Sequence, residues 1–153
     1  MSLNLSEPLR EAILGMYTVT DLLGTYGNEP SIFTRRPVPG EATYPMVVIS
    51  PDAAVFNQDS LVGFRPVVLR DVAVYGQENA TRNGTQVSDY RVVEALAYDL
   101  RERFHRRRDV IFFPDDDYYV IDVVASGPLV APTGDDRLIG RVVPLTIRLL
   151  KKG

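Results

Sequence analysis

The residues best suited to chemistry in this chain lie close together in one stretch, FHRRRDVIFFPDDDYYV. It holds the only histidine, His105, then a run of three arginines and, a few residues later, a run of three aspartates. Arginines bind phosphate groups, carboxylates can ligate divalent cations, and a histidine near a carboxylate can transfer protons. The stretch therefore permits a nucleic-acid site, a metal site or an acid–base pair. The charged residues in question are Arg106, Arg107, Arg108, Asp115, Asp116 and Asp117.

The arginines also have a structural interpretation, as the charged C-terminal end of a helix, where cations interact favourably with the helix dipole. Asp99 stands four residues before Arg103, and Glu102 stands four residues before Arg106. An acid placed first at this spacing favours an ion pair on a helix surface. The sequence favours a solvated, partly paired helix end, with contact to DNA or to an acidic partner as the alternative.

The aspartates follow Pro114, and proline next to aspartate is typical of a turn. Three adjacent side chains in an extended segment point to alternate sides, so Asp115 to Asp117 do not converge on one ion. A divalent-cation site would need further oxygen ligands from elsewhere in the chain. A turn is therefore favoured over the metal site of a phosphate-processing enzyme, and an acidic surface for a partner is the third possibility.

No motif in the chain indicates an enzyme. There is no cysteine, so thiolate catalysis, disulfides and zinc–sulfur sites are excluded. A histidine base would have to be His105, which also rules out a paired-histidine metal site. Nucleophile-elbow, dinucleotide-binding and phosphate-loop glycine patterns are all missing. We expect no catalytic, cofactor-binding or metal-binding residues.

Length and charge set further bounds. The 153 residues fit one domain, 1–153, better than two. Seventeen lysines and arginines against 20 aspartates and glutamates give a net charge of -3, which argues against a module that grips duplex DNA. The N-terminus lacks the pattern of a secretory signal, and no apolar run approaches the ~20 residues of a bilayer span. We expect a protein made in the cytoplasm, with no membrane partner.

Hydrophobic periodicity places these residues in an alternation of helices and strands. One helix is predicted from Ser6, as its N-cap, to Gly24, as its C-cap. A second helix, capped by Ser88 or Thr85, carries an apolar stripe from Tyr90 to Phe104. The predicted strands are Ser31–Arg35, Met46–Ser50, Pro66–Gly76, Tyr118–Ala125 and Arg141–Leu149. Loops are expected at residues 25–45, on both sides of the short first strand, and at residues 51–63 and 77–86.

The last strand shows strict alternation of apolar residues, from Val143 to Leu149, with Pro144, Thr146 and Arg148, which predicts one buried and one wet face. Pro144 cannot donate a ladder hydrogen bond, so we expect this strand at a sheet edge or at a bulge. The element order predicts an α+β fold: a mainly antiparallel β-sheet with two α-helices packed on one face.

The pattern as a whole resembles the tail terminator family of tailed bacteriophages, the tail-completion or minor tail proteins that cap the tail tube. The resemblance spans almost the full chain and rests on the order of the predicted elements and their residue patterns rather than on one motif. Other head–tail joining proteins of the phage neck share this architecture. The segments that carry it are PLREAILGMYTVTDLLG, RRPVPGEATYPMVVIS, VSDYRVVEALAYDLRERF and TGDDRLIGRVVPLTIRLLKK.

The resemblance implies a structural virion protein that forms a closed, most simply hexameric, ring at the head-proximal end of the tail. Such a ring ends tube polymerisation, contacts the tail tube protein and the neck or connector, and lets genomic DNA pass without specific binding. A head-to-tail ring needs two different complementary patches on each subunit. Our candidate patches are the arginine and aspartate runs, a proline-bearing arm with Pro37 and Pro39, and the strand that contains Pro144.

Overall fold

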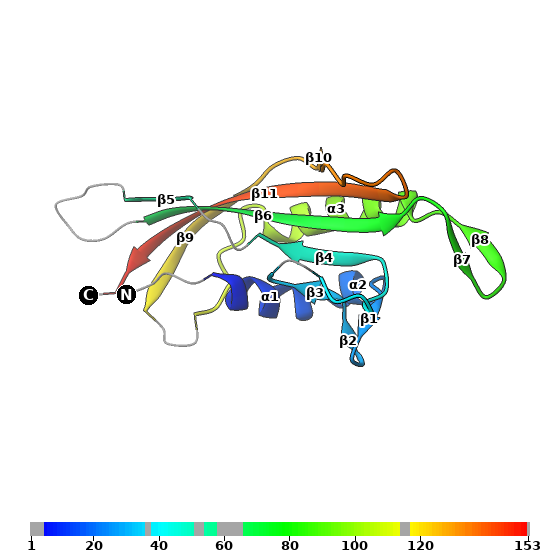
Figure 1. The fold of residues 1–153 in the computed structure, drawn as a ribbon. Helices are drawn as coiled ribbons and strands as arrows, with labels where there is room; N and C mark the ends of the chain where they lie inside the picture. Colours follow the sequence, from blue (N-terminus) through cyan, green and yellow to red (C-terminus); the bar gives the residue numbers. More distant parts are fainter. Residues whose placement is uncertain (1–4, 36–37, 51–53, 58–65, 114–116, 153) are drawn as a thin grey trace.

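Two long antiparallel strands, β6 (Pro66–Gln77) and β11 (Leu138–Lys151), form the centre of the fold (Figure 1). The structure is a computed structural model that describes residues 5–35, 38–50, 54–57, 66–113 and 117–152. The two strands stay in register from the Leu138–Gln77 pair to the Arg148–Val67 pair. All other parts of the described fold are arranged around this ribbon.

Shorter strands extend the ribbon on both sides: β3 (Ile32–Phe33), β4 (Met46–Ile49), β5 (Ala54–Asn57), β9 (Tyr118–Ala125) and β10 (Leu129–Val130). β9 and β10 both pair with the outer side of β11, while β4 and β5 both pair with β6. β3 lies beyond β4 and runs parallel to it; the other pairs in this sheet are antiparallel. The predicted mainly antiparallel sheet is confirmed.

The alternation predicted for the last strand is also confirmed, because Val143, Leu145, Ile147 and Leu149 are all buried whereas Arg148 is exposed. The edge position inferred from Pro144 is wrong, since β11 has strands on both sides. The Pro144 carbonyl accepts a hydrogen bond from the Ser126 N–H at 3.0 Å, so its backbone faces the interval where β9 has ended and β10 has not begun. The missing N–H therefore costs no bond to β6. The irregularity in this ladder lies between Arg148 and Leu149 instead.

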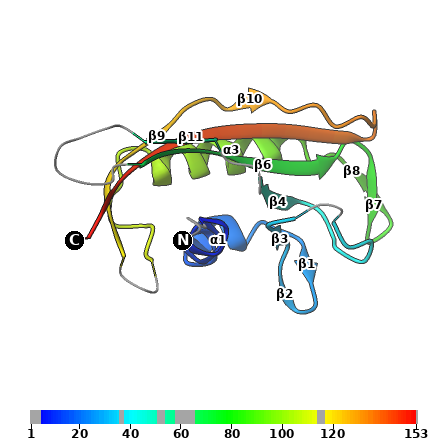
Figure 2. The same ribbon diagram turned by 60° about the vertical axis from the view of Figure 1, so that its left-hand side comes forward.

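Helix α3 (Tyr90–Phe104) covers the sheet and contacts β6, β9 and β11 (Figure 2). Its apolar stripe supplies Val93, Leu96, Leu100 and Phe104 to the core. The helix bounds match the predicted stripe, but the N-cap position is occupied by Asp89 rather than by Ser88 or Thr85.

The first predicted helix is broken in two: α1 (Ser6–Leu14) is followed by the short α2 (Tyr17–Thr20). Gly15 caps α1, because glycine weakens a helix by about 1 kcal/mol relative to alanine. Leu5 occupies the N-cap position predicted for Ser6, whose hydroxyl accepts a hydrogen bond from the buried Arg70 at 3.2 Å.

Three helices are thus present among the described residues, not two. α1 contacts α2 and β4, α2 also contacts α3, and the buried side chains of all three join one hydrophobic cluster with the sheet. None of the helices in the described part of the chain has the length and apolarity needed to span a bilayer.

Two hairpins leave the main sheet in regions that we expected to be loops. β1 (Thr25–Tyr26) pairs with β2 (Glu29–Pro30), and β7 (Ala80–Arg82) pairs with β8 (Thr85–Val87). The β7–β8 hairpin projects beyond the end of β6, as Figure 1 shows at its right-hand side. β5 likewise lies within a segment predicted to be a loop.

Candidate interaction surfaces

The arginine run lies beyond α3, not on its last turn, because His105 already has an extended backbone. Arg106 adopts a positive φ of 59°, and its N–H bonds the Val123 carbonyl at 2.7 Å. Its guanidinium forms an ion pair with Asp122 on β9, so the predicted pair with Glu102 is wrong. The left-handed backbone turns the side chain away from the helix surface on which that pair would form.

The arginines also face different surroundings. Arg107 lines a groove of about 640 Å³ between α1 and the end of α3, together with Asp99 and Arg103. Arg108 is exposed. The predicted ion pair between Asp99 and Arg103 is confirmed, at 3.3 Å. The run is therefore an exposed, divided cluster of charge rather than one flat basic patch.

Of the aspartate run, Asp115 and Asp116 lie outside the described residues. Asp117 is exposed, and its backbone carbonyl accepts a hydrogen bond from the Lys152 N–H at 2.8 Å. Among the residues that the structure describes, no group of three or more histidine, cysteine, aspartate or glutamate side chains could hold a metal ion.

His105 has a structural partner. Its Nδ1 atom accepts a hydrogen bond from the Ala125 N–H at 3.2 Å. This contact and the Arg106–Val123 bond beside it join the segment after α3 to the edge of β9 that faces away from β11. The covered edge is shielded from pairing with another strand.

The proline-bearing arm is partly described: Pro37 lies outside the described residues and Pro39 is half-buried. The Thr43 N–H bonds the Thr25 carbonyl at 3.0 Å, and the Thr25 N–H bonds the Thr43 hydroxyl at 2.7 Å. The end of the arm is therefore held on its own subunit. Its contact with a neighbouring subunit stays a prediction.

A buried carboxylate that the sequence analysis did not identify anchors the β7–β8 hairpin to the rest of the fold. Asp89, whose side chain is only 3% exposed, accepts two hydrogen bonds from the Arg82 guanidinium at 2.7 and 2.8 Å. It also accepts one from the Gln77 N–H at 2.8 Å. The hydrogen bond to Asp89 raises the pKa of Arg82 above its ordinary value. We call Arg82, Asp89 and the Gln77 N–H the hairpin clamp.

An apolar edge is a second feature that the sequence did not reveal. Leu129 and Val130 on β10 are 54% and 75% exposed. Gly127 precedes them with a positive φ of 80°, and a Cβ there would lie 2.9 Å from the Leu129 nitrogen. Only glycine fits this backbone without strain. Because adjacent strand residues point to opposite faces, the chain exposes one aliphatic side chain on each face of this sheet edge.

The outer face of the sheet carries an apolar groove of about 560 Å³. Tyr75 lies beside it because its cross-strand partner is Gly140, where an added Cβ would approach the tyrosine ring within 2.8 Å. We call this hollow the outer groove; it lies over β4 and β6, and its lining is Val38, Tyr44, Met46, Val48, Tyr75, Thr133 and Leu138.

Comparison with solved structures finds a fold similar to that of this chain in a virion component. No protein-family description matches this sequence. No curated protein matches it either. A chain of the virion of a native gene transfer agent particle superposes with a TM-score of 0.65 over 97% of this chain and 95% of that one, at 13% sequence identity. The two chains share a fold. The match includes nearly all of both chains, so it is not limited to the central ribbon of β6 and β11.

Proposed function

We propose that this chain is a structural virion protein that forms a ring at the head-proximal end of a phage-like tail, as a tail terminator. The observation that carries the proposal is the fold shared, over almost the whole of both chains, with a component of a gene transfer agent virion. The resemblance in element order to tail terminators adds the position within the particle.

The ring would end polymerisation of the tail tube and join the tail to the neck or connector. Genomic DNA would pass through the lumen without specific binding, and a net charge of -3 per subunit suits a channel that must not retain phosphates. The protein would act without catalysis or cofactor, its partners being its own copies, the tube protein and the connector protein.

Growth of tail tubes tests this proposal. The tube protein of the same particle is polymerised with and without this chain, and the lengths of the tubes are measured by electron microscopy. We expect added chain to bind one end of each tube and to shorten the length distribution. Unchanged tube lengths, with no ring at either end, would contradict a terminator function.

Another head–tail joining protein of the neck is the second candidate, because the fold similarity to a virion component carries no position in the particle. A neck protein would leave tube growth unchanged and would bind heads that contain the portal. The same tubes and purified heads, each incubated with the chain and then sedimented, distinguish the two functions. A cation-dependent phosphate-processing enzyme using Asp115 to Asp117 would show activity that requires magnesium or manganese.

A further inference from the structure

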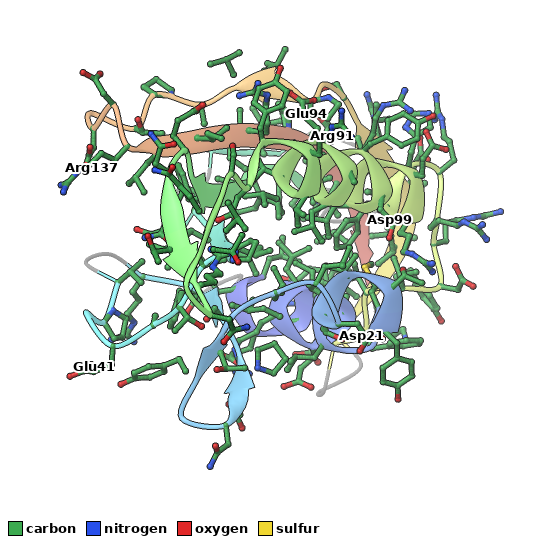
Figure 3. The ribbon with its side chains drawn as sticks, turned by 90° about the vertical axis from the view of Figure 1, so that its right-hand side faces the viewer. Asp21, Glu41, Arg91, Glu94, Asp99 and Arg137 are labelled. Carbon is green, nitrogen blue, oxygen red and sulfur yellow. The ribbon has the colours of Figure 1, made fainter. Side chains whose placement is uncertain are left out.

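The tip of the β7–β8 hairpin carries the only asparagine in the sequence that is followed directly by glycine, Asn83-Gly84. Both residues are exposed. The hairpin projects from the end of the sheet, and Figure 3, in which that end faces the viewer, shows it in the foreground. None of its residues belongs to the hydrophobic cluster that the described chain forms. The hairpin is therefore held in place by polar contacts rather than by the core.

An asparagine before glycine can lose its side-chain amide without an enzyme. The Gly84 backbone nitrogen attacks the Asn83 side-chain carbonyl carbon, a new C–N bond forms, and the bond to the amide nitrogen breaks. Ammonia leaves with the proton that the Gly84 nitrogen gives up. Water then opens the five-membered ring at either carbonyl, which yields aspartate or, with one extra methylene group in the backbone, isoaspartate. Glycine favours the attack because it has no side chain, and the space where a Cβ of Gly84 would lie is open.

The turn in the structure keeps the reacting atoms apart. Arg82 pairs with Thr85 across a two-residue loop, in which Asn83 and Gly84 have φ angles of 54° and 76°. Two positive φ angles in such a loop define a type I′ turn, and ψ at its first loop residue is about +30°. At this ψ the Gly84 nitrogen lies nearly opposite the Asn83 Cβ across the Cα–C bond, whereas ring closure requires both on the same side. The reaction therefore requires the hairpin to open.

The hairpin clamp opposes this opening. Arg82, the residue directly before Asn83, donates two hydrogen bonds to Asp89 at 2.7 and 2.8 Å and a third to the Gln77 side chain at 3.3 Å. A two-stranded hairpin by itself is at best marginally stable in water, and each strand of this one has only three residues. The closed state of the turn thus depends on the contacts of Arg82 with Asp89.

We propose that Asn83 is a site of spontaneous deamidation and that the hairpin clamp sets its rate. The product carries one more negative charge than the unmodified chain, whose net charge is -3, and this charge lies at the exposed tip of the hairpin. Where isoaspartate forms, the extra methylene group no longer fits a two-residue turn of this type, so the hairpin stays open. The modification is independent of the proposed function, because it requires only this chain and water.

Peptide mapping by mass spectrometry measures deamidation of the full chain during incubation in mildly alkaline buffer. We expect Asn83 to react at least about tenfold more slowly in the folded chain than in the same chain unfolded in urea, and Asp89→Ala to remove most of this protection. Arg82→Ala should do the same, and it keeps the Asp89 bond to the Gln77 N–H if Asp89→Ala does not fold. Asp99→Ala, which alters an exposed ion pair away from the hairpin, is the control and should react like the unmodified chain.

Two other exposed asparagines serve as internal references. Asn28 precedes glutamate and Asn79 precedes alanine, so both should react far more slowly than Asn83 does in the unfolded chain. Equal rates at Asn83 in the folded and the unfolded chain would overturn the inference, and this comparison needs no variant. An Asn83 that stays intact in the unfolded chain would also overturn it, as would equal rates in the unmodified chain and in a clamp variant that keeps the native circular dichroism spectrum.

Discussion

At the scale of single residues, Asp89 is a buried carboxylate that accepts hydrogen bonds from Arg82 and from the Gln77 N–H. Replacing it by alanine removes both bonds to Arg82 and leaves the Gln77 N–H without its acceptor. Because leaving such groups unsatisfied costs about 1–3 kcal/mol, we expect Asp89→Ala to lower the free energy of unfolding by that amount. Urea denaturation, followed by circular dichroism, measures it.

Asp99→Ala is the matched control for the hairpin clamp. Asp99 pairs with Arg103 and accepts a hydrogen bond from the Thr18 hydroxyl at 2.8 Å. Both contacts are solvent-exposed, and exposed ion pairs contribute roughly 0.2–1 kcal/mol. We expect the control to shift the urea midpoint far less than Asp89→Ala does. Equal shifts would show that Asp89 is no more important to stability than an ordinary surface acid.

His105 gives a second prediction at this scale. Its Nδ1 atom accepts one backbone hydrogen bond, from Ala125. His105→Ala should therefore cost about 1 kcal/mol of stability and leave assembly and particle infectivity intact. Loss of infectivity in a folded His105→Ala protein would contradict the proposal that the chain acts without catalysis.

At the scale of elements, the packing of α3 on β6 depends on Gly76. A Cβ at this position would lie 2.6 Å from both the Asp89 Cβ and a methyl group of Val93. Overpacking of this kind typically costs 1–3 kcal/mol, so we expect Gly76→Ala to lower the thermal midpoint by several degrees. Gly40→Ala, at a glycine with no atom within 4 Å of an added Cβ, is the control and should change it little. A normal midpoint for Gly76→Ala would contradict this close approach.

The sequence predicted the elements that have strong periodicity and missed those that depend on distant contacts. The stripe from Tyr90 to Phe104 and the strand Tyr118–Ala125 were predicted with their observed bounds. The polar composition of residues 77–86 predicts a loop, whereas the structure has the β7–β8 hairpin there. Asn83-Gly84, both with positive φ, is a recognised hairpin-turn signal. Its polar flanks gave no alternation by which to recognise strands.

The candidate surfaces were less predictable than the fold. Pro144 suggested an edge strand, and local chemistry alone could not show that the partner of β11 changes from β10 to β9 at this point. The hairpin clamp could not be predicted, because an aspartate directly before a helix has the sequence pattern of an ordinary N-cap. The exposed β10 side chains and the outer groove could not be predicted, since sequence alone does not say which apolar side chains stay exposed.

At the scale of the whole molecule, the exposed arginine run gives a prediction about assembly. Changing Arg106, Arg107 and Arg108 together to glutamate should leave the monomer folded, because exposed pairs such as that of Arg106 with Asp122 contribute only about 0.2–1 kcal/mol. We expect the joining of ring, tube or neck to slow, as charge complementarity acts mainly on association rate. Stopped-flow light scattering at increasing salt measures this rate. If the variant joins at the same rate as the unmodified chain, with the same salt dependence, the arginine run has no function in assembly.

The position of the chain in an assembled particle tests the account most directly. Cryo-electron microscopy of a particle that contains this protein would resolve the fold of β6, β11 and α3 and so place each copy. We predict a closed ring of copies between the last tail-tube ring and the neck. Copies located in the head shell or at the distal tip of the tail would contradict this prediction.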